Sequence, residues 1–323
     1  MKHVFIALAI MLGILLIAVL GFKLYDYIGA AEFYNNSEVI FKTPGVADSN
    51  FVPQGMTYDE ANKTFFFTGY MGKPILGELG DDVAFSEQNA QNSYYTCTTI
   101  VSTFVTKKVD LIMANATPAL QAAQEGTLEI PILGTSITEY GVALGIENFN
   151  GTVGGNVSGT SDLAPLDKQA EMVLEFVPDA KNVGLLYCSA EPNSKYQADT
   201  IAAEFDKLSL EYKIYTVADT NEVASVVTQA CSENDAIYIP TDNTLVSATA
   251  TVNEIAANAK IPVITADEGS AAVCAIATLS VDYYDIGYKA GEMAYDILVN
   301  GKNPADMQIE YAANPTKKYV AAN

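Results

Sequence analysis

The sequence of 323 residues contains no arginine and no tryptophan, and its single histidine is His3. Without arginine, the chain has no guanidinium group that can grip a phosphate through two parallel hydrogen bonds. Without a histidine beyond residue 3, the rest of the chain has no imidazole base, which excludes a Ser-His-Asp triad. These absences argue against most classes of enzyme.

Positive charge is also scarce, because 17 lysines face 39 acidic residues and leave a net charge of −22. Such a chain is repelled by nucleic acid and by anionic lipid surfaces. The four cysteines, at positions 97, 188, 231 and 274, stand alone and form no CxxC pair. We therefore expect no zinc site, no other metal and no cofactor, and interpret the cysteines as small buried apolar residues. Disulfides stay open as an alternative if the chain is outside the cell.

One long apolar run is present, at residues 4–22, directly after Lys2 and His3. It is long enough to span a bilayer and longer than the core of a usual signal peptide. We therefore expect residues 1–23 to be a transmembrane anchor that keeps the N-terminus inside and the soluble part extracytoplasmic. A cleaved signal peptide is the alternative.

Residues 24–75 have a different character from the rest of the chain. They contain the segment FVPQG at 51–55 and the strand-like segment TFFFTGYM at 64–71. This pattern resembles the opening of a membrane-anchored β-propeller-type protein, and one blade fragment cannot close a propeller. We interpret residues 24–75 as an atypical β-rich stalk segment or a hairpin, joined to the following domain as in a gene fusion.

The remaining chain alternates β-rich runs with amphipathic segments, which is typical of a parallel sheet. Residues 236–239 (AIYI) predict a buried strand, 245–259 a helix and 261–264 a second strand. The same layout occurs earlier, with strands predicted at 109–116 and 130–133. Further strands are predicted at 83–85, 181–187, 210–217, 275–280 and 307–311, and further helices at 97–105, 119–124, 163–176, 221–231 and 282–298.

A glycine-rich stretch occupies residues 150–161 (NGTVGGNVSGTS). It lacks the Lys-Ser/Thr ending of a phosphate-binding loop and does not connect a clear strand to a helix. We interpret it as a segment that crosses between two lobes, because glycine permits the sharp backbone changes that a hinge needs.

Six motifs in this part of the chain resemble, in the same order, those of ABC transporter solute-binding proteins of the aromatic amino-acid (tryptophan/tyrosine) type. They are QNAQN at 88–92, ATPA at 116–119, GGNVSG at 154–159, SAEPNS at 189–194, PTDN at 240–243 and DYYDIG at 282–287. The resemblance implies a type I periplasmic-binding fold, which has two Rossmann-like lobes with parallel sheets and a hinge. It also implies an ABC permease as the partner.

The chain departs from that family at its start, because the first βα unit of lobe 1 is missing or replaced by the anchor and residues 24–75. This departure puts the stability of lobe 1 and its affinity for a ligand in doubt. We assign residues 76–160 and 275–300 to lobe 1, and residues 161–274 and 301–323 to lobe 2.

A zwitterionic amino acid needs donors for its carboxylate, acceptors for its ammonium and a pocket for its side chain. We expect Thr117, at a predicted helix start, to contact the carboxylate. Asp242, Glu191 and Asp267 lie at predicted strand ends and are the candidates for the ammonium. The other polar candidates are Gln88, Asn89, Thr138, Glu139, Ser194 and Asn243, and Tyr140 and Tyr187 are candidates for stacking on an aromatic ligand. For each of them, an ordinary capping or buried structural role is the alternative.

The sequence thus favours a monomeric, membrane-anchored binding protein that captures a small amino-acid-like solute and catalyses no reaction. A glycosidase with a pair of carboxylates is a second hypothesis, but no spacing selects such a pair. A membrane-tethered surface protein, or a fusion that binds no ligand, is the third.

Overall fold

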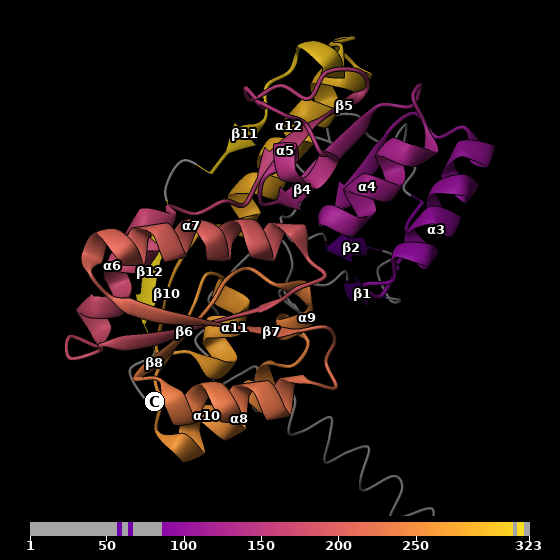
Figure 1. Cartoon of the computed structure of the whole chain (residues 1–323). Helices are drawn as coiled ribbons and strands as arrows, with labels where there is room; N and C mark the ends of the chain where they lie inside the picture. Colours follow the sequence, from indigo (N-terminus) through magenta and orange to yellow (C-terminus); the bar gives the residue numbers. More distant parts are fainter. Residues whose placement is uncertain (1–56, 60–63, 67–85, 313–314, 320–323) are drawn as a thin grey trace, which may run out of the picture. The chain divides into compact units, whose positions relative to one another are not determined.

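The structure is a computed structural model, which describes residues 57–59, 64–66, 86–312 and 315–319 (Figure 1). The chain divides into Met1–Asn50, which lies outside the described residues, and Phe51–Asn323, to which everything below belongs. The predicted anchor at 4–22 and the predicted strand at 83–85 are therefore also outside the described part. Within that part, no helix has the length and apolar character needed to cross a bilayer. Strands β1 (Thr57–Asp59) and β2 (Thr64–Phe66) pair antiparallel as a hairpin.

Lobe 1 is built on a four-stranded parallel sheet in the order β11-β5-β4-β3. Its strands are β3 (Ile112–Asn115), β4 (Ile132–Ile137), β5 (Val157–Ser161) and β11 (Glu310–Tyr311). Its helices are α3 (Tyr94–Lys107), α4 (Thr117–Gly126), α5 (Tyr140–Leu144) and α12 (Tyr283–Leu298), and the 3-10 helix η2 is Pro304–Asp306. Within the described residues β3 is the outermost strand of this sheet.

Successive residues of β4 bury their side chains on opposite faces of this sheet. Ile132 packs with the cluster that includes Val101 of α3 and Leu120 of α4. The next residue, Leu133, packs against Met293 and Ile297 of α12. This alternation is the two-residue period of a strand, and it places helices on both faces.

Lobe 2 is built on a six-stranded sheet in the order β12-β10-β9-β8-β6-β7, in which only β12 is antiparallel to its neighbour. Its strands are β6 (Asn182–Cys188), β7 (Glu211–Val217), β8 (Ala236–Ile239), β9 (Val263–Thr265), β10 (Ala277–Ser280) and β12 (Thr316–Tyr319). Its helices are α6 (Leu166–Phe176), α7 (Pro192–Leu208), α8 (Val223–Glu233), α9 (Asn243–Val246), α10 (Thr249–Ala259) and α11 (Glu268–Cys274).

Helices cover both faces of the six-stranded sheet as well, with α6 and α7 on one side and α8 and α10 on the other (Figure 1). Ile237 of β8 belongs to the core under α8 and α10, whereas its neighbour Tyr238 belongs to the core under α6 and α7. The two predicted parallel sheets are therefore present, and each has its own buried core.

The predicted lobe boundaries differ from the observed pairing in the last quarter of the chain. Residues 275–300 were predicted to belong to lobe 1, but β10 pairs with β9 in the six-stranded sheet, and only α12 packs on lobe 1. Residues 301–323 were predicted to belong to lobe 2, but β11 pairs with β5 of lobe 1. The chain therefore returns to lobe 1 after β10, and reaches lobe 2 again only with β12.

Two local predictions also need correction. The glycine-rich segment 150–161 does not cross between lobes throughout, because its last five residues form the buried strand β5. The helix predicted at 245–259 is split into α9 and α10, because Ala248 leaves the helical conformation, with φ of −116° and ψ of 11°.

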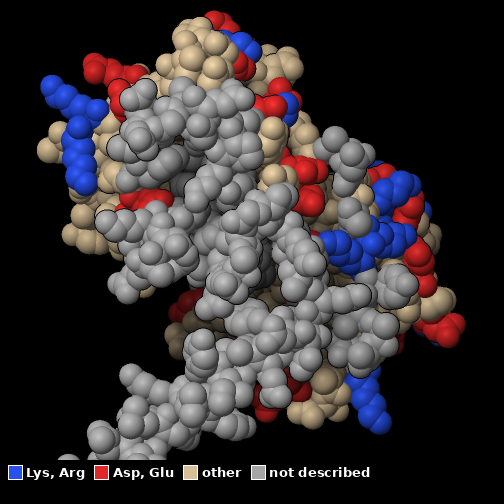
Figure 2. Space-filling view, turned by 180° about the vertical axis from the view of Figure 1, so that it is seen from behind, with Lys and Arg blue, Asp and Glu red and all other residues tan. Residues whose placement is uncertain are grey.

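The described surface carries both signs of charge, and lysines lie beside acidic residues at several places on the face shown in Figure 2. Pairs such as Lys195 with Asp199 and Lys302 with Asp296 have nitrogen–oxygen distances of 2.6 Å. These pairs are largely exposed, and exposed ion pairs contribute little to stability.

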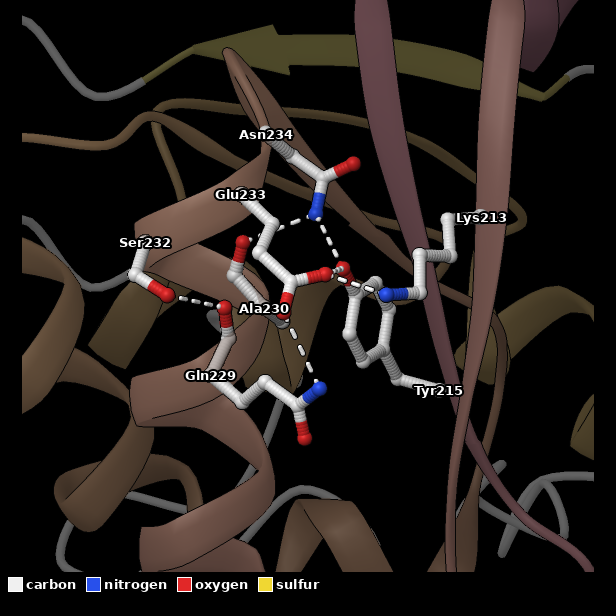
Figure 3. Close-up of polar contacts among 7 residues, drawn as sticks. All are labelled: Lys213, Tyr215, Gln229, Ala230, Ser232, Glu233 and Asn234. Atoms are coloured by element: carbon white, nitrogen blue, oxygen red, sulfur yellow. Dashed lines mark hydrogen bonds and ion pairs between the residues drawn. The ribbon is translucent and has the colours of Figure 1, made fainter.

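A polar cluster fastens the end of α8 to the edge strand β7 (Figure 3). The side-chain amide of Asn234 donates to the hydroxyl of Tyr215 and to the carbonyl of Ala230, both at 2.8 Å. The Glu233 carboxylate accepts from Lys213 and, at 2.8 Å, from the hydroxyl of Tyr215. Each group in this cluster has a partner inside the cluster, so we interpret it as a structural fastening of β7.

Candidate functional site

A cavity of about 520 Å³ lies where strands of both sheets end. Polar residues at or just after the ends of β3, β4 and β5 line it from lobe 1, and residues after β6 and β8 line it from lobe 2. These are Asn115, Thr117, Ser136, Thr138 and Asp162 from lobe 1, and Asn193, Thr241 and Asn243 from lobe 2. Ligands of parallel sheets bind at the carboxyl ends of the strands, so this cavity is the candidate site.

The lobe 1 side of the cavity has an unusual backbone at the start of α4. Ala116 has φ of +72°, a conformation that residues other than glycine rarely adopt, and no side chain caps the helix behind it. Thr117 is the first residue of α4 and is 3% exposed. Ser136, at the end of β4, also has a positive φ of +54°. Backbone strain of this kind is concentrated at ligand sites, where the surrounding structure holds it in place.

Asp162 follows β5 directly and lines the cavity while only 5% of its surface is exposed. The hydroxyl of Tyr283, the first residue of α12, donates to its Oδ2 at 3.1 Å. Its Oδ1 has no hydrogen-bond partner in the described part of the chain. Burial raises the pKa of Asp162 from 3.8 to about 6, although the hydroxyls of Tyr283 and Thr138 oppose this shift.

An apolar wall completes the cavity. It is formed by the inner face of α3 and by β3, with one contribution from α9. Its members include Ile100, Phe104, Ile112, Met113 and Val246. A wall of this kind suits an apolar or aromatic ligand group.

Four of the predicted site residues line this cavity: Gln88, Thr117, Thr138 and Asn243. The other four, Glu191, Ser194, Asp242 and Asp267, lie near strand ends as predicted but are not among the lining residues. Of the lower-ranked candidates, Asn89 lines the cavity, whereas Glu139 accepts from the backbone of Val142 and caps α5. Tyr140 and Tyr187, the candidates for stacking, are buried outside the lining.

Glu191 joins the start of α7 to the start of α9. Its Oε2 accepts from the backbone and the side chain of Asn243, at 2.9 and 2.8 Å. Its Oε1 accepts from the backbone and the hydroxyl of Thr244, at 2.8 and 2.7 Å. Both oxygens are thus used inside the protein, and Glu191 acts on the cavity by holding Asn243 in its wall.

Asp242 and Asp267 cap helices. Asp242 caps α9 by accepting from the backbone of Leu245 at 2.8 Å, and it also accepts from the backbone of Cys188 at 2.6 Å. Burial and the nearby Glu191 carboxylate raise its pKa. Asp267 caps α11 by accepting from the backbone of Ser270 at 2.7 Å. Ser194 donates to the carbonyl of Thr241 at 3.2 Å and so supports a lining residue.

The prediction missed several lining residues, of which Asp162 and Tyr283 are the most informative. Asp162 was overlooked because residues 150–161 were interpreted as a segment that crosses between the lobes. Had residues 157–161 been recognised as a buried strand, Asp162 would have been the polar residue at its carboxyl end. Tyr283 belongs to the segment DYYDIG, which was noted as a motif of the resemblance and as a helix start but not as part of the site.

No lysine is among the described residues that line the cavity, and Glu87 is the second acidic residue there. Burial raises the pKa of Glu87 to about 7. The described residues also contain no group of three or more His, Cys, Asp or Glu side chains that can hold a metal ion. The site therefore offers hydroxyls, amides and carboxyls, which suits recognition of a small polar molecule.

Comparison with known proteins gives consistent matches. A family model described as ABC transporter substrate binding protein matches residues 76–319. A tyrosine-binding protein of Clostridioides difficile (strain R20291) is 39% identical over 230 residues, which cover 71% of this chain. The matched part spans 66% of that relative, slightly less than two thirds of its length.

Two solved structures are also similar. The ABC domain in complex with L-Trp from Streptococcus pneumonia is 30% identical, covers 76% of this chain and 86% of its own, and has a TM-score of 0.71. The ligand-free, open form of a substrate-binding protein with adhesive properties from Clostridium difficile is 36% identical. It covers 77% of this chain and 85% of its own, with a TM-score of 0.60.

Proposed function

Because the chain belongs to the ABC transporter substrate-binding proteins, we propose that it captures a small amino acid with an aromatic side chain and delivers it to an ABC permease. The observation that carries this proposal is the convergence of polar strand ends from both sheets on one cavity with an apolar wall. Relatives described as binding tyrosine or L-Trp support the aromatic character of the ligand.

The two ends of such a ligand match different parts of the cavity. The carboxylate lies at the start of α4, where the Thr117 hydroxyl and the positive end of the helix dipole favour a negative charge. The aromatic side chain packs against the wall formed by Ile100, Phe104 and Met113. Burial of the ring against this wall supplies affinity, and the polar groups fix its orientation.

We further propose that residues 4–22 anchor the chain in the membrane with the soluble part outside the cytoplasm, and that the chain works as a monomer. An anchor keeps the binding domain close to the permease without a separate docking step. The family is one of solute-binding proteins, and we propose that this member catalyses no reaction. The competing hypothesis is a membrane-tethered surface protein or a fusion that binds no ligand.

Thermal unfolding of the full chain in detergent, with and without each standard amino acid, tests this proposal. A ligand at about 100 times its Kd raises the midpoint by about 5 °C, because it binds only the folded state. We expect this rise with tyrosine, phenylalanine or tryptophan and not with glycine or aspartate. Unchanged midpoints with all amino acids would favour the competing hypothesis.

Two matched variants locate the binding event. Thr117→Val removes a hydroxyl from the cavity wall and should reduce the ligand-induced rise. Thr103→Val makes the same change on the exposed face of α3 and should leave the rise intact. Equal responses of both variants would place the ligand elsewhere.

A further inference from the structure

The acidic residues around the cavity differ in whether their oxygens are already used. Both oxygens of Glu191 and both of Asp242 accept hydrogen bonds from backbone or side-chain groups of the protein. Asp267 has one oxygen without a partner in the described part, but it is not among the lining residues. Asp162 lines the cavity, and its Oδ1 has no hydrogen-bond partner in the described part of the chain.

A buried carboxylate oxygen without a partner is costly, because it has lost its water and gained nothing in return. Nearly all buried polar atoms in folded proteins have a hydrogen-bond partner. Asp162 is 5% exposed, and no lysine lies among the described residues of the cavity wall to neutralise it. A molecule that enters the cavity and donates hydrogen bonds would supply the missing partner.

We propose that Asp162, held in place by Tyr283, receives the ammonium group of the ligand and makes the site selective for small molecules with a protonated amine. This inference rests on the proposed function. An ammonium supplies the donors and the positive charge that Oδ1 lacks, and charge-assisted hydrogen bonds are the strong ones. Tyr283 is a positioning residue, because its hydroxyl donates to Oδ2 and leaves Oδ1 as the oxygen available to a ligand.

The two residues come from two of the connections between the lobes. Asp162 follows β5, where the chain leaves lobe 1, and Tyr283 opens α12, where the chain returns from lobe 2. Their hydrogen bond thus joins two connecting segments at the cavity wall. A ligand that binds Asp162 therefore contacts the place where these two segments meet.

The test compares phenylalanine or tyrosine with the analogue that lacks the amino group, 3-phenylpropionate, by titration calorimetry on the full chain. Loss of one partner from a buried charge pair weakens binding by about 100-fold. Asp162→Asn should weaken amino-acid binding by about that factor and leave the affinity for 3-phenylpropionate unchanged. Asp285→Asn removes a charge from an exposed position of the same region and should change the affinity by less than about threefold.

Tyr283→Phe should weaken amino-acid binding by about tenfold, the value of a hydrogen bond to a charged group. A readout specific to positioning is the pH profile. The titratable groups that act on Asp162 are Tyr283, Asp267 and Tyr140, and the Tyr283 hydrogen bond lowers the pKa of Asp162. Protonation of Asp162 removes the negative charge that binds the ammonium group. Amino-acid affinity should therefore fall as the pH drops through about 6. This midpoint should move to higher pH in Tyr283→Phe, vanish in Asp162→Asn and stay in place in Tyr288→Phe.

The outcomes separate this inference from the proposed function. If the unmodified chain binds an aromatic amino acid and Asp162→Asn binds it equally well, the function stands and the role of Asp162 is refuted. Equal loss of amino acid and 3-phenylpropionate in Asp162→Asn would make Asp162 a structural residue and overturn the inference. If the unmodified chain binds no amino acid, both proposals fall together.

Discussion

Glu191 and Asp162 are both buried carboxylates, yet they have different tasks. Every oxygen of Glu191 is engaged with the start of α9, whereas Oδ1 of Asp162 has no partner in the described part of the chain. Burial alone therefore does not identify a binding residue. The pairing of each oxygen distinguishes a carboxylate that holds the fold from one that can hold a ligand.

Gly159 occupies a position at which the structure requires a glycine. It has φ of +145°, and a Cβ there would lie 2.1 Å from the carbonyl oxygen of Gly134 and 2.4 Å from the Tyr140 hydroxyl. The Tyr140 hydroxyl donates to the carbonyl of Thr160 at 3.0 Å and fills the space above both glycines. The two glycines are thus required by the close approach of Tyr140 to the sheet.

We predict that Gly159→Ala lowers the free energy of unfolding by about 3 kcal/mol or more, because the methyl group meets backbone that cannot move away. Urea denaturation followed by circular dichroism measures this loss. Gly155→Ala is the matched control, since Gly155 also has a positive φ, of +61°, but faces open space. Its cost should stay near 1 kcal/mol. Equal costs at both positions would show that backbone strain, and not the contact with Gly134, is decisive.

The residues of the site were only partly predictable from sequence. Thr117 and Thr138, which line the cavity, were predicted as candidates because a polar residue after an apolar, β-rich run is a visible signal. Asp242 and Glu191 give the same signal, but they cap or clamp helix α9, and no sequence pattern reveals which oxygens are already occupied. Asp162 was missed because β5 contains serine, glycine and threonine in place of the usual large apolar residues.

At the scale of elements, the start of α7 is fastened to the loop between β8 and α9. Besides Glu191, the side chains of Asn193, Ser194 and Gln197 all donate to the carbonyl of Thr241. The backbone of Thr241 in turn donates to Gln197. These hydrogen bonds hold Thr241 and Asn243 in the cavity wall. The position of the lobe 2 residues of the site therefore depends on α7.

We predict that Glu191→Gln lowers the free energy of unfolding by about 2 kcal/mol, because the amide replaces one accepting oxygen with a donor that faces other donors. Chemical denaturation measures this change. The variant should also weaken ligand binding, since Asn243 loses its support. Glu211→Gln, on an exposed position of β7, is the control and should leave both quantities within experimental error. If ligand affinity is unchanged in Glu191→Gln, the contacts of Glu191 with α9 stabilise the fold but do not support the ligand site.

Most elements of lobe 2 could be predicted from the sequence, because each buried strand is a run of apolar residues between polar turns. The predicted strand at 236–239 matches β8 residue for residue. The start of α10 was not predictable, since residues 243–259 keep a helical spacing through the break, which is a change of backbone conformation at Ala248. Helix α11 was missed because its seven residues are too few to show a period.

At the scale of the whole molecule, the assignment of strands to sheets was the least predictable feature. Ala277–Ser280 and Glu310–Tyr311 were placed in the wrong lobes, although strands were expected near both positions. A strand pairs through its backbone, which carries no residue-specific signal, so the partner is decided by the path of the chain. The crossing segments after β5 and β10 determine that path.

We predict that titration of Asp162 alone removes about 1–2 kcal/mol of unfolding free energy from the free chain as the pH rises from 5 to 8. Asp162 has a pKa of about 6 in the folded chain and 3.8 as its ordinary value, so the folded chain holds a proton that the unfolded chain has lost. Stability therefore falls as the pH rises through this window. Burial also raises the pKa of Asp242 and Asp267, and the net charge of −22 acts in the same direction.

Glu233 does not contribute to the change in unfolding free energy between pH 5 and pH 8. Its pKa is lowered to about 2, chiefly by Lys213, so its contribution is lost only at more acidic pH. Urea denaturation at pH 5 and pH 8 measures the predicted slope, and Asp162→Asn should make it shallower because an amide does not titrate. A chain that is equally stable or more stable at pH 8 would contradict the prediction.

The same proton must act on stability and binding in opposite directions. Protonation of Asp162 relieves the cost of a buried charge in the free chain, but it also removes the negative charge that an ammonium would meet. The stabilisation produced by a saturating aromatic amino acid should therefore be larger at pH 8 than at pH 5, because the free chain is less stable at pH 8. Asp162→Asn should make this ligand-induced stabilisation small and independent of pH, because the group that couples the two equilibria is gone.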